Sequence, residues 1–446
     1  MLAAVLREAT FHDTRGVEVE VVDDQLDVID QPWLPPSRCL AGRCAEIVGV
    51  QTVTSSLKNG VKLLDEVRQR LPDALTVMGG VGPTPVAEDL VARGSTDVVV
   101  RGEGEFVFSA LVAGYRTAGR TALRDVPGIT FRDESGAVRS NPSPPQIANL
   151  DCLPLAARDL VDMAQYRRIS RGRAGNLITS RGCSFACAYC YSRHQWGVGQ
   201  RRHSVERVVR EMKLLVDRYG LDRIRIEDDD FLEDRGWAFE LCDALEREGL
   251  ADRAEWEAKA RPDHLDDELA ARLRRAGCFR LLVGVETLDP ALLRRLGRPL
   301  KVSLVTHALR CLQRAQIGIQ ATMILGIPGE TDEAMRHTIS WLQELLGENP
   351  HDIISPCFFV PFNHEVERSM SRRMEFTVEV HDTDAYTGHI PVTSSHACSS
   401  DELWGLYDDM TPDRRGRYDR IAHLAPLHEV QRRTAPALAA VVPEVV

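Results

Sequence analysis

The residues with the clearest chemical potential are three cysteines, Cys183, Cys187 and Cys190, which lie within a stretch of eight residues. Three residues separate the first pair and two separate the second pair. Thiolates are soft ligands that suit zinc and iron–sulfur clusters, and a structural zinc or a fully ligated cluster takes four protein ligands. A site with only three protein ligands keeps one position for a molecule on which it can act. The spacing therefore predicts a metal centre with an open coordination position.

A zinc site is the main alternative, because histidines lie close enough in the chain to supply a fourth ligand. His194 stands four residues beyond Cys190, and His203 follows nine residues later. Three cysteines and one histidine make a closed tetrahedral zinc site. Such a site would make the chain a non-enzymatic zinc module, so the elements around the cysteines have to decide between the two interpretations.

The elements that position the cysteines form a repeating pattern of strand and helix. Leu177, Ile178 and Thr179 have the character of the end of a buried strand, which puts the cysteines in a loop. Further strands are expected at 224–227, 256–260, 281–285, 319–324 and 353–360. Helices are expected at 205–219 with Ser204 as N-cap, at 237–248, and after Asp266, Asp289-Pro290 and Thr331. Six such units predict an incomplete parallel barrel with its chemistry at the carboxyl ends of the strands.

Four of the later strand ends carry residues that suit a polar organic ligand. They are Glu227-Asp228-Asp229-Asp230, Lys259-Ala260-Arg261, Gly284-Val285-Glu286-Thr287 and Leu325-Gly326-Ile327-Pro328-Gly329-Glu330. An ammonium group needs carboxylate acceptors, and a planar base needs a backbone with few side chains beside it. The alternative is that the carboxylates are solvated helix caps and that Gly326 to Gly329 form an ordinary turn.

Residues 1 to about 118 also alternate between strand and helix patterns. Strands are expected at 17–22, 47–53, 75–78 and 98–100, and this order predicts a parallel sheet covered by helices, with ligands at the carboxyl ends of its strands. The chain begins inside the pattern of the first helix, so the first strand of such a sheet, which is normally central, is expected to be missing. A hairpin is expected from Pro127 to Arg139, and the proline-rich run at 141–145 predicts an extended linker.

Composition limits the class of protein. The chain has 446 residues, of which 43% are apolar and 27% charged, as in soluble globular proteins with two or three domains. A formal net charge of -11 argues against a general nucleic-acid-binding surface. Outside the trio, the other eight of the 11 cysteines are scattered singly, which fits a reducing compartment better than a disulfide framework. Without a signal-peptide core or a membrane-spanning run, the chain is predicted to be cytoplasmic.

The cysteine spacing, with Tyr189 just before the last cysteine, resembles the signature of the radical S-adenosylmethionine (SAM) enzymes, and the four strand ends resemble that family's SAM-binding elements. The resemblance implies that Cys183, Cys187 and Cys190 hold three irons of a 4Fe-4S cluster. The fourth iron takes the amino and carboxylate groups of SAM, which an electron from the cluster cleaves to a 5'-deoxyadenosyl radical. The residues implied in SAM binding are Tyr189, Glu227, Asp229, Arg261, Glu286, Thr287, Ile324 and Gly326.

The N-terminal half resembles the cobalamin-binding domains that are fused to radical SAM barrels. The resemblance rests on Ser55-Ser56-Leu57, on Gly79-Gly80 and on Arg101-Gly102-Glu103-Gly104-Glu105, each after an expected strand. It implies cobalamin contacts from Thr54, Ser55, Leu57, Gly79, Gly80, Gly102 and Glu103, where small residues let the nucleotide tail of the corrinoid lie against the backbone. The histidine element that ligates cobalt in many cobalamin proteins is absent, as it is in many radical SAM members. The alternative is that the serines cap a helix and the glycines form ordinary turns.

These patterns and resemblances divide the chain into four parts. We predict a doubly wound α/β domain that lacks its first strand over residues 1–140, a linker over 141–172, a partial (β/α)6 barrel over 173–365 and a C-terminal region over 366–446. Within the last part, Tyr386, His389, His396 and Cys398 lie in a loop-like stretch that is expected to cover the barrel mouth.

The resemblance also implies a function. In such enzymes the adenosyl radical removes a hydrogen atom and methylcobalamin delivers a methyl group, so the chain is expected to methylate an unactivated carbon of a small molecule of secondary metabolism. The cluster implies an external electron donor of the flavodoxin or ferredoxin type. Three alternatives stay open at this point: a cobalamin-binding cyclase or oxidoreductase without methyl transfer, a corrinoid carrier, and the zinc module.

Overall fold

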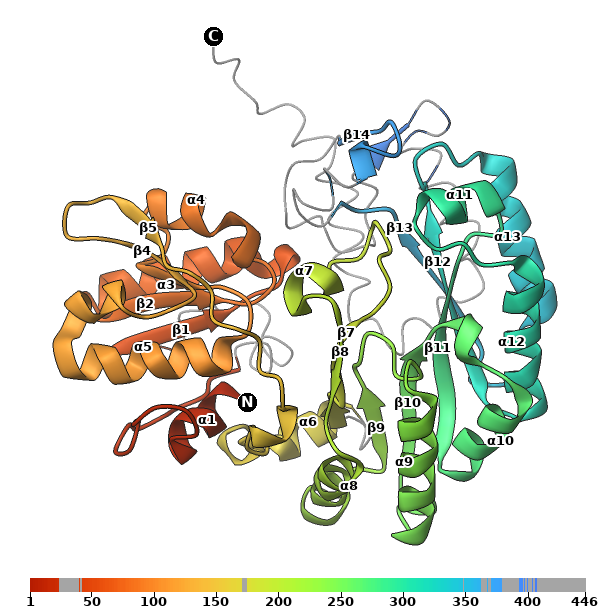
Figure 1. Cartoon of the computed structure of the whole chain (residues 1–446), viewed down its shortest axis with the longest axis horizontal. Coiled ribbons are helices and arrows are strands. Elements are labelled where there is room, and N and C mark those ends of the chain that lie inside the picture. Colours follow the sequence, from red (N-terminus) through yellow and green to blue (C-terminus); the bar gives the residue numbers. More distant parts are fainter. Residues whose placement is uncertain are drawn as a thin grey trace.

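The computed structural model describes residues 1–23, 42–170, 175–347, 349–361 and 370–378, and in addition residues 40, 367, 393–395, 397, 399, 403 and 406. Two sheets organise the chain. Figure 1 shows the smaller sheet and its helices to one side of the larger one, with helix α7 (Ser192–Trp196) on the side of the larger sheet that faces the smaller one. Within the described residues, no helix is both long and apolar enough to cross a membrane.

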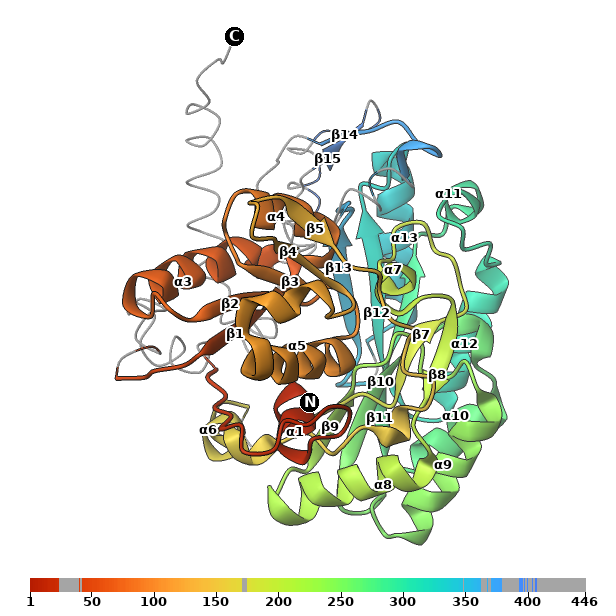
Figure 2. The ribbon, with the colours of Figure 1, turned by 60° about the vertical axis from the view of Figure 1, so that its left-hand side comes forward.

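The N-terminal sheet has the order β1-β2-β3-β4-β5. Strands β1 (Ile47–Gln51), β2 (Leu75–Gly79) and β3 (Val98–Val100) are parallel, whereas β4 (Ile129–Arg132) and β5 (Val138–Ser140) continue the sheet antiparallel. Helices α1 (Leu2–Glu8), α3 (Leu57–Arg70), α4 (Ala87–Ala92) and α5 (Gly104–Ala118) pack on it, and Figure 2 shows α1 beneath α5. The expected parallel strands and the hairpin are confirmed, since β4 and β5 pair around the turn at 133–136.

The expected strand at 17–22 is wrong. These residues form no strand, and Val21 and Val22 are 37% and 42% exposed. Val17 and Val19 nevertheless pack against the core that contains Leu6, so the alternation of apolar and polar residues comes from an extended segment lying on that core. Within the described residues β1 is an edge strand that pairs with β2 alone, so the segment at 17–22 does not extend the sheet.

The larger sheet has six parallel strands in the order β13-β12-β11-β10-β9-β6. They are β6 (Gly175–Leu177), β9 (Arg223–Ile226), β10 (Glu255–Ala260), β11 (Cys278–Glu286), β12 (Gly318–Leu325) and β13 (Ile353–Phe358). The helices are α6 (Met163–Ile169), α8 (Val205–Lys213), α9 (Arg235–Arg247), α10 (Asp267–Arg275), α11 (Pro290–Arg295), α12 (Val302–Arg314) and α13 (Asp332–Leu345). This architecture confirms the predicted class, a doubly wound N-terminal sheet followed by a partial barrel.

Local sequence explains where the barrel helices begin. Ser204, Asp266, Asp289 and Thr331 each accept a hydrogen bond from a backbone N–H of the first turn, as expected for N-caps. The expected helix after Asp289-Pro290 is the short α11, and α12, which the sequence analysis did not single out, makes the main crossing to β12. The strand faces under the helices are apolar and closely packed; Leu281, Val283 and Val285 of β11 are fully buried.

The cysteine segment does not continue directly from β6 as expected. β6 ends at Leu177, Ile178 is 46% exposed, and a separate antiparallel ribbon follows, β7 (Ser180–Cys183) paired with β8 (Gly199–Arg202). Gly182 has φ +89°, and a Cβ there would lie 2.3 Å from the carbonyl oxygen of Gly199, so only glycine allows the two strands to approach this closely. The cysteines therefore stand at the end of a ribbon that projects from the sheet edge.

Candidate active site

The three cysteines occupy the end of β7 and the loop after it. The loop is held by backbone hydrogen bonds from Ala188 N to Leu296 O (2.8 Å) and from Cys190 N to Cys187 O (3.1 Å). Burial raises the pKa of the Cys183 thiol to about 12 and that of Cys190 to about 11, and the nearby Cys187 thiol adds to both effects. These part-buried thiols, with Cys187 near enough to affect the other two, are a suitable donor set for iron, because coordination by a cation reverses this effect and deprotonates them.

The histidines proposed for the zinc alternative lie elsewhere. The ring of His203 is hydrogen-bonded to Asp151 (3.0 Å), and His194 stacks on Tyr191 with ring centroids 5.7 Å apart. Within the described part of the chain, the group of three or more potential metal ligands whose ligand atoms all lie within 4.8 Å of one another consists of Cys183, Asp230 and Glu233. That group contains neither a histidine nor the other two cysteines, so the geometry gives the zinc module no support.

A polar triad of Tyr189, Glu286 and Arg298 lies at the cysteine loop, with Glu286 and Arg298 buried and Tyr189 half-buried. The hydroxyl of Tyr189 donates to Glu286 Oε1 (3.0 Å), and Arg298 Nη2 donates to the carbonyl of Gly284 (2.8 Å). Burial raises the pKa of Glu286, and the Arg298 charge and the Tyr189 hydrogen bond oppose that rise. A Cβ at Gly284 would lie 2.5 Å from Glu286 Oε1, so this glycine leaves room for the carboxylate. Glu286 is thus an acceptor held next to the cysteine loop.

Arg261 faces the thiols from β10. Its guanidinium lies 3.4 Å from the ring centroid of Phe185, and Nη1 lies 3.8 Å from Cys187 Sγ. Two hydrogen bonds to the Asp263 carboxylate, of 2.9 and 2.8 Å, fix its orientation. A planar cation held in this way is suited to a carboxylate ligand beside the cysteines.

The acidic run at the end of β9 divides into residues with different surroundings. Asp229 accepts a hydrogen bond from the Ser192 hydroxyl (2.7 Å), two residues past Cys190, and so reaches the cysteine loop. Glu227 is paired with Lys259 (3.0 Å) and Arg225 (2.8 Å). Asp228 is fully buried and accepts hydrogen bonds from the backbone and hydroxyl groups of Thr179 and Ser180, at 2.5 to 3.0 Å. It therefore ties β9 to the start of the ribbon.

The remaining SAM candidates lie on β11 and β12. Thr287 and Ile324 are buried, and Ile324 belongs to an apolar cluster with Ala188, Leu296 and Phe359 that contacts Tyr189 and Tyr191. Gly326 has φ +74°, which only glycine adopts without strain. The structure thus brings Tyr189, Asp229, Arg261 and Glu286 to the cysteine loop and packs Ile324 beneath it.

Glu330, the last residue of the β12 loop, is predicted to make folding pH-dependent. Burial raises its pKa from 4.5 to about 8, although the Thr287 hydroxyl and nearby backbone N–H groups oppose that rise. An acid whose pKa is raised by folding stabilises the native state fully below pH 4.5, and that contribution is lost as the pH rises towards 8. Glutamine does not titrate, so the Glu330→Gln variant should not lose this stability as the pH rises. The free energy of unfolding of the variant minus that of the natural chain should therefore increase by a few kcal/mol from about pH 5 to about pH 8. Urea unfolding at both pH values measures this; a difference that is the same at both would contradict it.

The N-terminal candidates gather at the carboxyl ends of β1, β2 and β3. Thr52 N donates to Gly79 O (3.0 Å), Gly82 N donates to Thr52 O (3.2 Å), and Gly102 N donates to the Thr84 hydroxyl (3.3 Å). Thr54 and Ser55 are half-buried, Leu57 is 9% exposed and Val53 is 50% exposed. A Cβ at Gly80 would lie 2.5 Å from Thr52 O, whereas one at Gly102 would meet nothing within 4 Å. Gly80 is therefore needed for packing between loops, and Gly102 faces open space, as a cofactor contact would require.

Glu103 was expected to contact cobalamin, but its surroundings do not suit that role. Its carboxylate is buried against Arg181 and Arg201 of the cysteine ribbon. The proposed covering residues Tyr386, His389, His396 and Cys398 lie outside the described residues.

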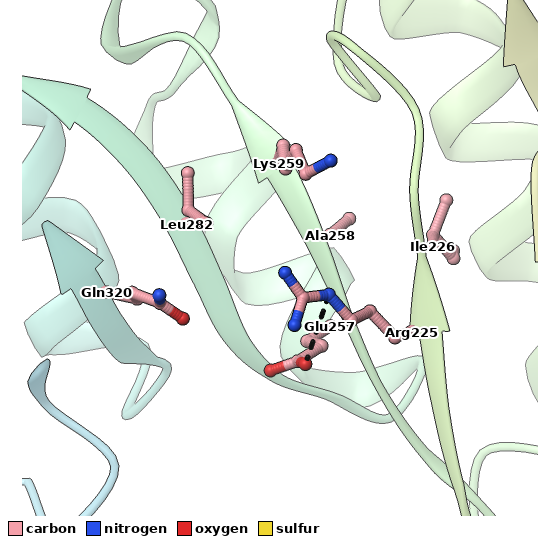
Figure 3. A pocket seen from close by; sticks show the side chains of 7 residues that line it. All are labelled: Arg225, Ile226, Glu257, Ala258, Lys259, Leu282 and Gln320. Carbon is pink, nitrogen blue, oxygen red and sulfur yellow. Dashed lines mark ion pairs between the residues drawn. The ribbon is translucent and has the colours of Figure 1, made fainter. Parts of the chain in front are cut away.

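Sequence reasoning missed the inner face of the barrel sheet. Figure 3 shows Arg225, Glu257 and Lys259 projecting into a pocket between β9 and β12 that Leu282 and Gln320 also line. Glu257 pairs with Arg280 through a 2.7 Å hydrogen bond and lies 3.8 Å from Arg225. The alternation of charged residues at 223, 225 and 227 and at 255, 257 and 259 was the available signal. Arg298 was missed as well, and no motif marks it.

Two family models match the chain. The model of the radical SAM superfamily matches residues 177–342, and the model of the B12 binding domain matches residues 1–112. The first match includes strands β9 to β12 of the larger sheet, and the second includes strands β1 to β3 of the smaller sheet.

Curated relatives include methyltransferases and a cyclase. An uncharacterized methyltransferase of Pyrococcus horikoshii is 31% identical over 302 residues, and the cytidylyl-2-hydroxyethylphosphonate methyltransferase of Streptomyces wedmorensis is 28% identical over 343 residues. Each match covers 67% of this chain. The anaerobic magnesium-protoporphyrin IX monomethyl ester cyclase of Cereibacter sphaeroides is 26% identical over 80% of this chain. The chain spans less than two thirds of these relatives, 64%, 62% and 58% of their respective lengths.

Solved structures share the fold. The radical SAM methyltransferase TsrM from Kitasatospora setae, with cobalamin and a [4Fe-4S] cluster bound, has a TM-score of 0.70 at 21% identity, covering 92% of this chain and 88% of that one. The cobalamin-dependent SAM radical enzyme OxsB with aqua-cobalamin bound has a TM-score of 0.65 at 18% identity, covering 92% of this chain and 58% of that one.

Proposed function

Since this chain belongs to the radical SAM superfamily and carries a B12 binding domain, we propose that it is a cobalamin-dependent radical SAM methyltransferase that methylates an unactivated carbon of a small molecule. The predicted cofactors, a 4Fe-4S cluster, SAM and cobalamin, are confirmed by the two family matches. The observation that carries the proposal is the convergence of Tyr189, Asp229, Arg261 and Glu286 on the cysteine loop, on the side of the barrel that the B12 binding domain faces.

The residues of the chain take separate roles in this proposal. Cys183, Cys187 and Cys190 hold the cluster, which supplies the electron that cleaves SAM when both are bound. Asp229 and Glu286 offer carboxylate oxygens to the ammonium of SAM, and Arg261 offers its guanidinium to the SAM carboxylate. Ile324 offers the adenine an apolar contact, and Leu403 packs against the Gly326 backbone next to it. Glu286 is buried and Tyr189 is half-buried, which limits the access of water to this part of the site, as a primary radical requires.

The inner face of the barrel supports a polar substrate. Arg225, Lys259 and Glu257 line the pocket there, so its lining carries one more positive than negative charge. Glu227 and Arg280 form ion pairs with these three side chains. A large apolar ligand would remove these groups from water without replacing their hydrogen bonds, which is costly. We therefore propose a small polar substrate from secondary metabolism. We also propose that an electron donor of the flavodoxin or ferredoxin type reduces the cluster.

The experiment that tests the proposal follows the methyl group. The chain is reconstituted anaerobically with iron, sulfide and cobalamin and incubated with SAM labelled with deuterium in its methyl group, a reductant and an extract of small molecules from the source. A product that has gained the labelled methyl group supports methyl transfer. Turnover that leaves no label in any product would instead support a cyclase or oxidoreductase. The similarity to the protoporphyrin cyclase of Cereibacter sphaeroides is the reason to test this alternative.

Gly79 provides a specific test of the cobalamin contact. A Cβ at Gly79 would make ordinary contacts with Val100 O at 3.7 Å and Val100 Cβ at 3.8 Å, so Gly79→Ala should change the free energy of unfolding by less than about 1 kcal/mol. If the nucleotide tail of cobalamin lies against this backbone, the added methyl group should weaken cobalamin binding by about tenfold. Spectroscopic titration with hydroxocobalamin measures the affinity. An unchanged affinity would exclude the contact.

Gly80→Ala is the matched comparison. Its Cβ would lie 2.5 Å from Thr52 O at a positive φ of +106°, so this variant should lose stability whether or not cobalamin is present.

A further inference from the structure

A cluster of four charged side chains joins the N-terminal domain to the cysteine ribbon. We call Glu103, Glu105, Arg181 and Arg201 the interdomain clasp. Glu103 Oε1 accepts from Arg181 Nη1 (2.7 Å) and Arg201 Nη1 (2.9 Å), and Glu103 Oε2 accepts from Arg201 Nη1 (2.9 Å). Glu105 Oε1 accepts from Arg181 Nη2 (2.5 Å). The two domains therefore meet through hydrogen bonds between full charges.

The clasp is buried and includes the segment that connects the domains. The Glu103, Glu105 and Arg181 side chains are only 7–8% exposed, and Arg201 is 15% exposed. Ile147 N donates to Glu103 Oε2 (2.9 Å), and Ile147 O accepts from Arg201 Nη1 (2.7 Å). The Arg181 guanidinium also lies 5.1 Å from the ring centroid of Trp196 in α7. Three segments that are distant in sequence are thus fixed at one point.

Charge balance makes the clasp sensitive to the loss of one member. Two carboxylates face two guanidinium groups, and burial leaves little water to solvate a charge that loses its partner. Removing one member of a buried pair costs more than the pair itself contributes, because the other charge remains buried. Loss of one member therefore leaves its partner charge buried and without a counter-charge.

The clasp residues are close in sequence to both expected cofactor sites. Arg181 stands two residues before Cys183 in β7. Glu103 directly follows Gly102, which faces open space at the carboxyl end of β3. A shift of the clasp would move the cysteine loop relative to the loops of the B12 binding domain.

We propose that the interdomain clasp sets the position of the cysteine ribbon relative to the B12 binding domain, and that Glu103 is a positioning residue in it and not a cobalamin contact. Both oxygens of Glu103 are occupied by Arg181, Arg201 and Ile147, which leaves the side chain no oxygen for a corrinoid. The consequence for catalysis rests on the proposed function, since methyl transfer requires the two cofactors to face each other across this contact.

The test uses the full chain without SAM or substrate and compares Glu103→Gln with Arg201→Gln, which changes the same contact from the ribbon side. Hydrogen–deuterium exchange is measured at Ile147 and over β7 and β8, and hydroxocobalamin affinity is measured by spectroscopic titration. Both variants should exchange at least about tenfold faster at these amides, because the contact opens locally. They should also have the same hydroxocobalamin affinity as each other.

Three results would overturn the proposal. One is unchanged exchange in both variants, and another is faster exchange in only one of them. The third is a loss of hydroxocobalamin affinity in Glu103→Gln that Arg201→Gln does not share, which would show a direct cofactor contact. Glu134→Gln, in an exposed pair with Arg124 on the same domain, is the control and should leave both measurements unchanged.

Arg201→Lys keeps the test decisive if the glutamine variants fail to fold, since it keeps the charge but cannot bridge Glu103 and Ile147 in the same way. It should accelerate exchange at Ile147 and leave β1 and β2 protected. Because exchange and corrinoid affinity are measured without turnover, failure of the methyltransferase proposal would leave this result unaffected.

Discussion

The Cys187→Ala variant is expected to bind no complete 4Fe-4S cluster and to cleave no SAM above background. Cys187 lies between the other two cysteines in the chain, and its thiol interacts with both of theirs. Its Sγ also lies 3.8 Å from Arg261, the cation that we assign to the SAM carboxylate. Two remaining protein ligands cannot hold three irons, so the electron that cleaves SAM is no longer supplied. Iron content, the visible absorption of the cluster and 5'-deoxyadenosine formation after anaerobic reconstitution measure the effect.

Cys44→Ala is the matched control for this variant. Cys44 is exposed and lies in the N-terminal domain, far from the ribbon in sequence. Its replacement should leave iron content and SAM cleavage as they are in the natural chain. A Cys187→Ala protein that still formed 5'-deoxyadenosine at the natural rate would contradict the assignment of the three cysteines.

Asp228→Ala should have the second largest effect, on folding and on the cluster together. Asp228 is fully buried and accepts four hydrogen bonds from Thr179 and Ser180, the residues that lead from β6 into the ribbon. Alanine leaves two buried backbone N–H groups and two hydroxyls without their acceptor. We expect the free energy of unfolding to fall by about 3–5 kcal/mol and iron content after reconstitution to fall with it. Urea unfolding and iron analysis of the same preparation measure both effects.

Asp228→Asn separates hydrogen bonding from charge. Its remaining carbonyl oxygen accepts from both backbone N–H groups, and its amide donates to the two hydroxyls, which can rotate to accept. The loss of stability should therefore be less than half of that in the alanine variant, with the cluster retained. Equal destabilisation by asparagine and alanine would contradict the hydrogen-bonding role and show that the carboxylate charge matters more.

The fold was largely predictable from local patterns. Helix starts at Ser204, Asp266, Asp289 and Thr331 follow from residues whose side chains cap their own first turn, an interaction within three residues. The barrel strands follow from short segments of strand length that are apolar on the face under the helices, with alternating charged residues in β9 and β10. The strand expected at 17–22 was wrong because alternation of apolar residues reports burial on one face and not the presence of a neighbouring strand.

The candidate site was predictable in its residue types and not in their roles. The three cysteines were named from their spacing, and Tyr189, Asp229, Arg261 and Glu286 from the resemblance of their motifs to the radical SAM family. In contrast, Asp228 and Glu103 looked like their neighbours in the sequence, yet one is a structural clamp and the other an interdomain contact. Consecutive residues at a strand end point in different directions, and only the packing of other segments decides which of them faces a ligand.

The sequence by itself determined the kind of chemistry, because ligand type, ligand number and spacing lie within one short segment. Only the tertiary structure decided how that segment is held: on a separate ribbon, β7 and β8, tied to β9 by Asp228 and to the B12 binding domain through Arg181 and Arg201. These contacts join residues that are 48 to 98 positions apart in the chain. No local pattern records such a pairing, since the free energy of a buried charge depends on which partner the fold brings to it.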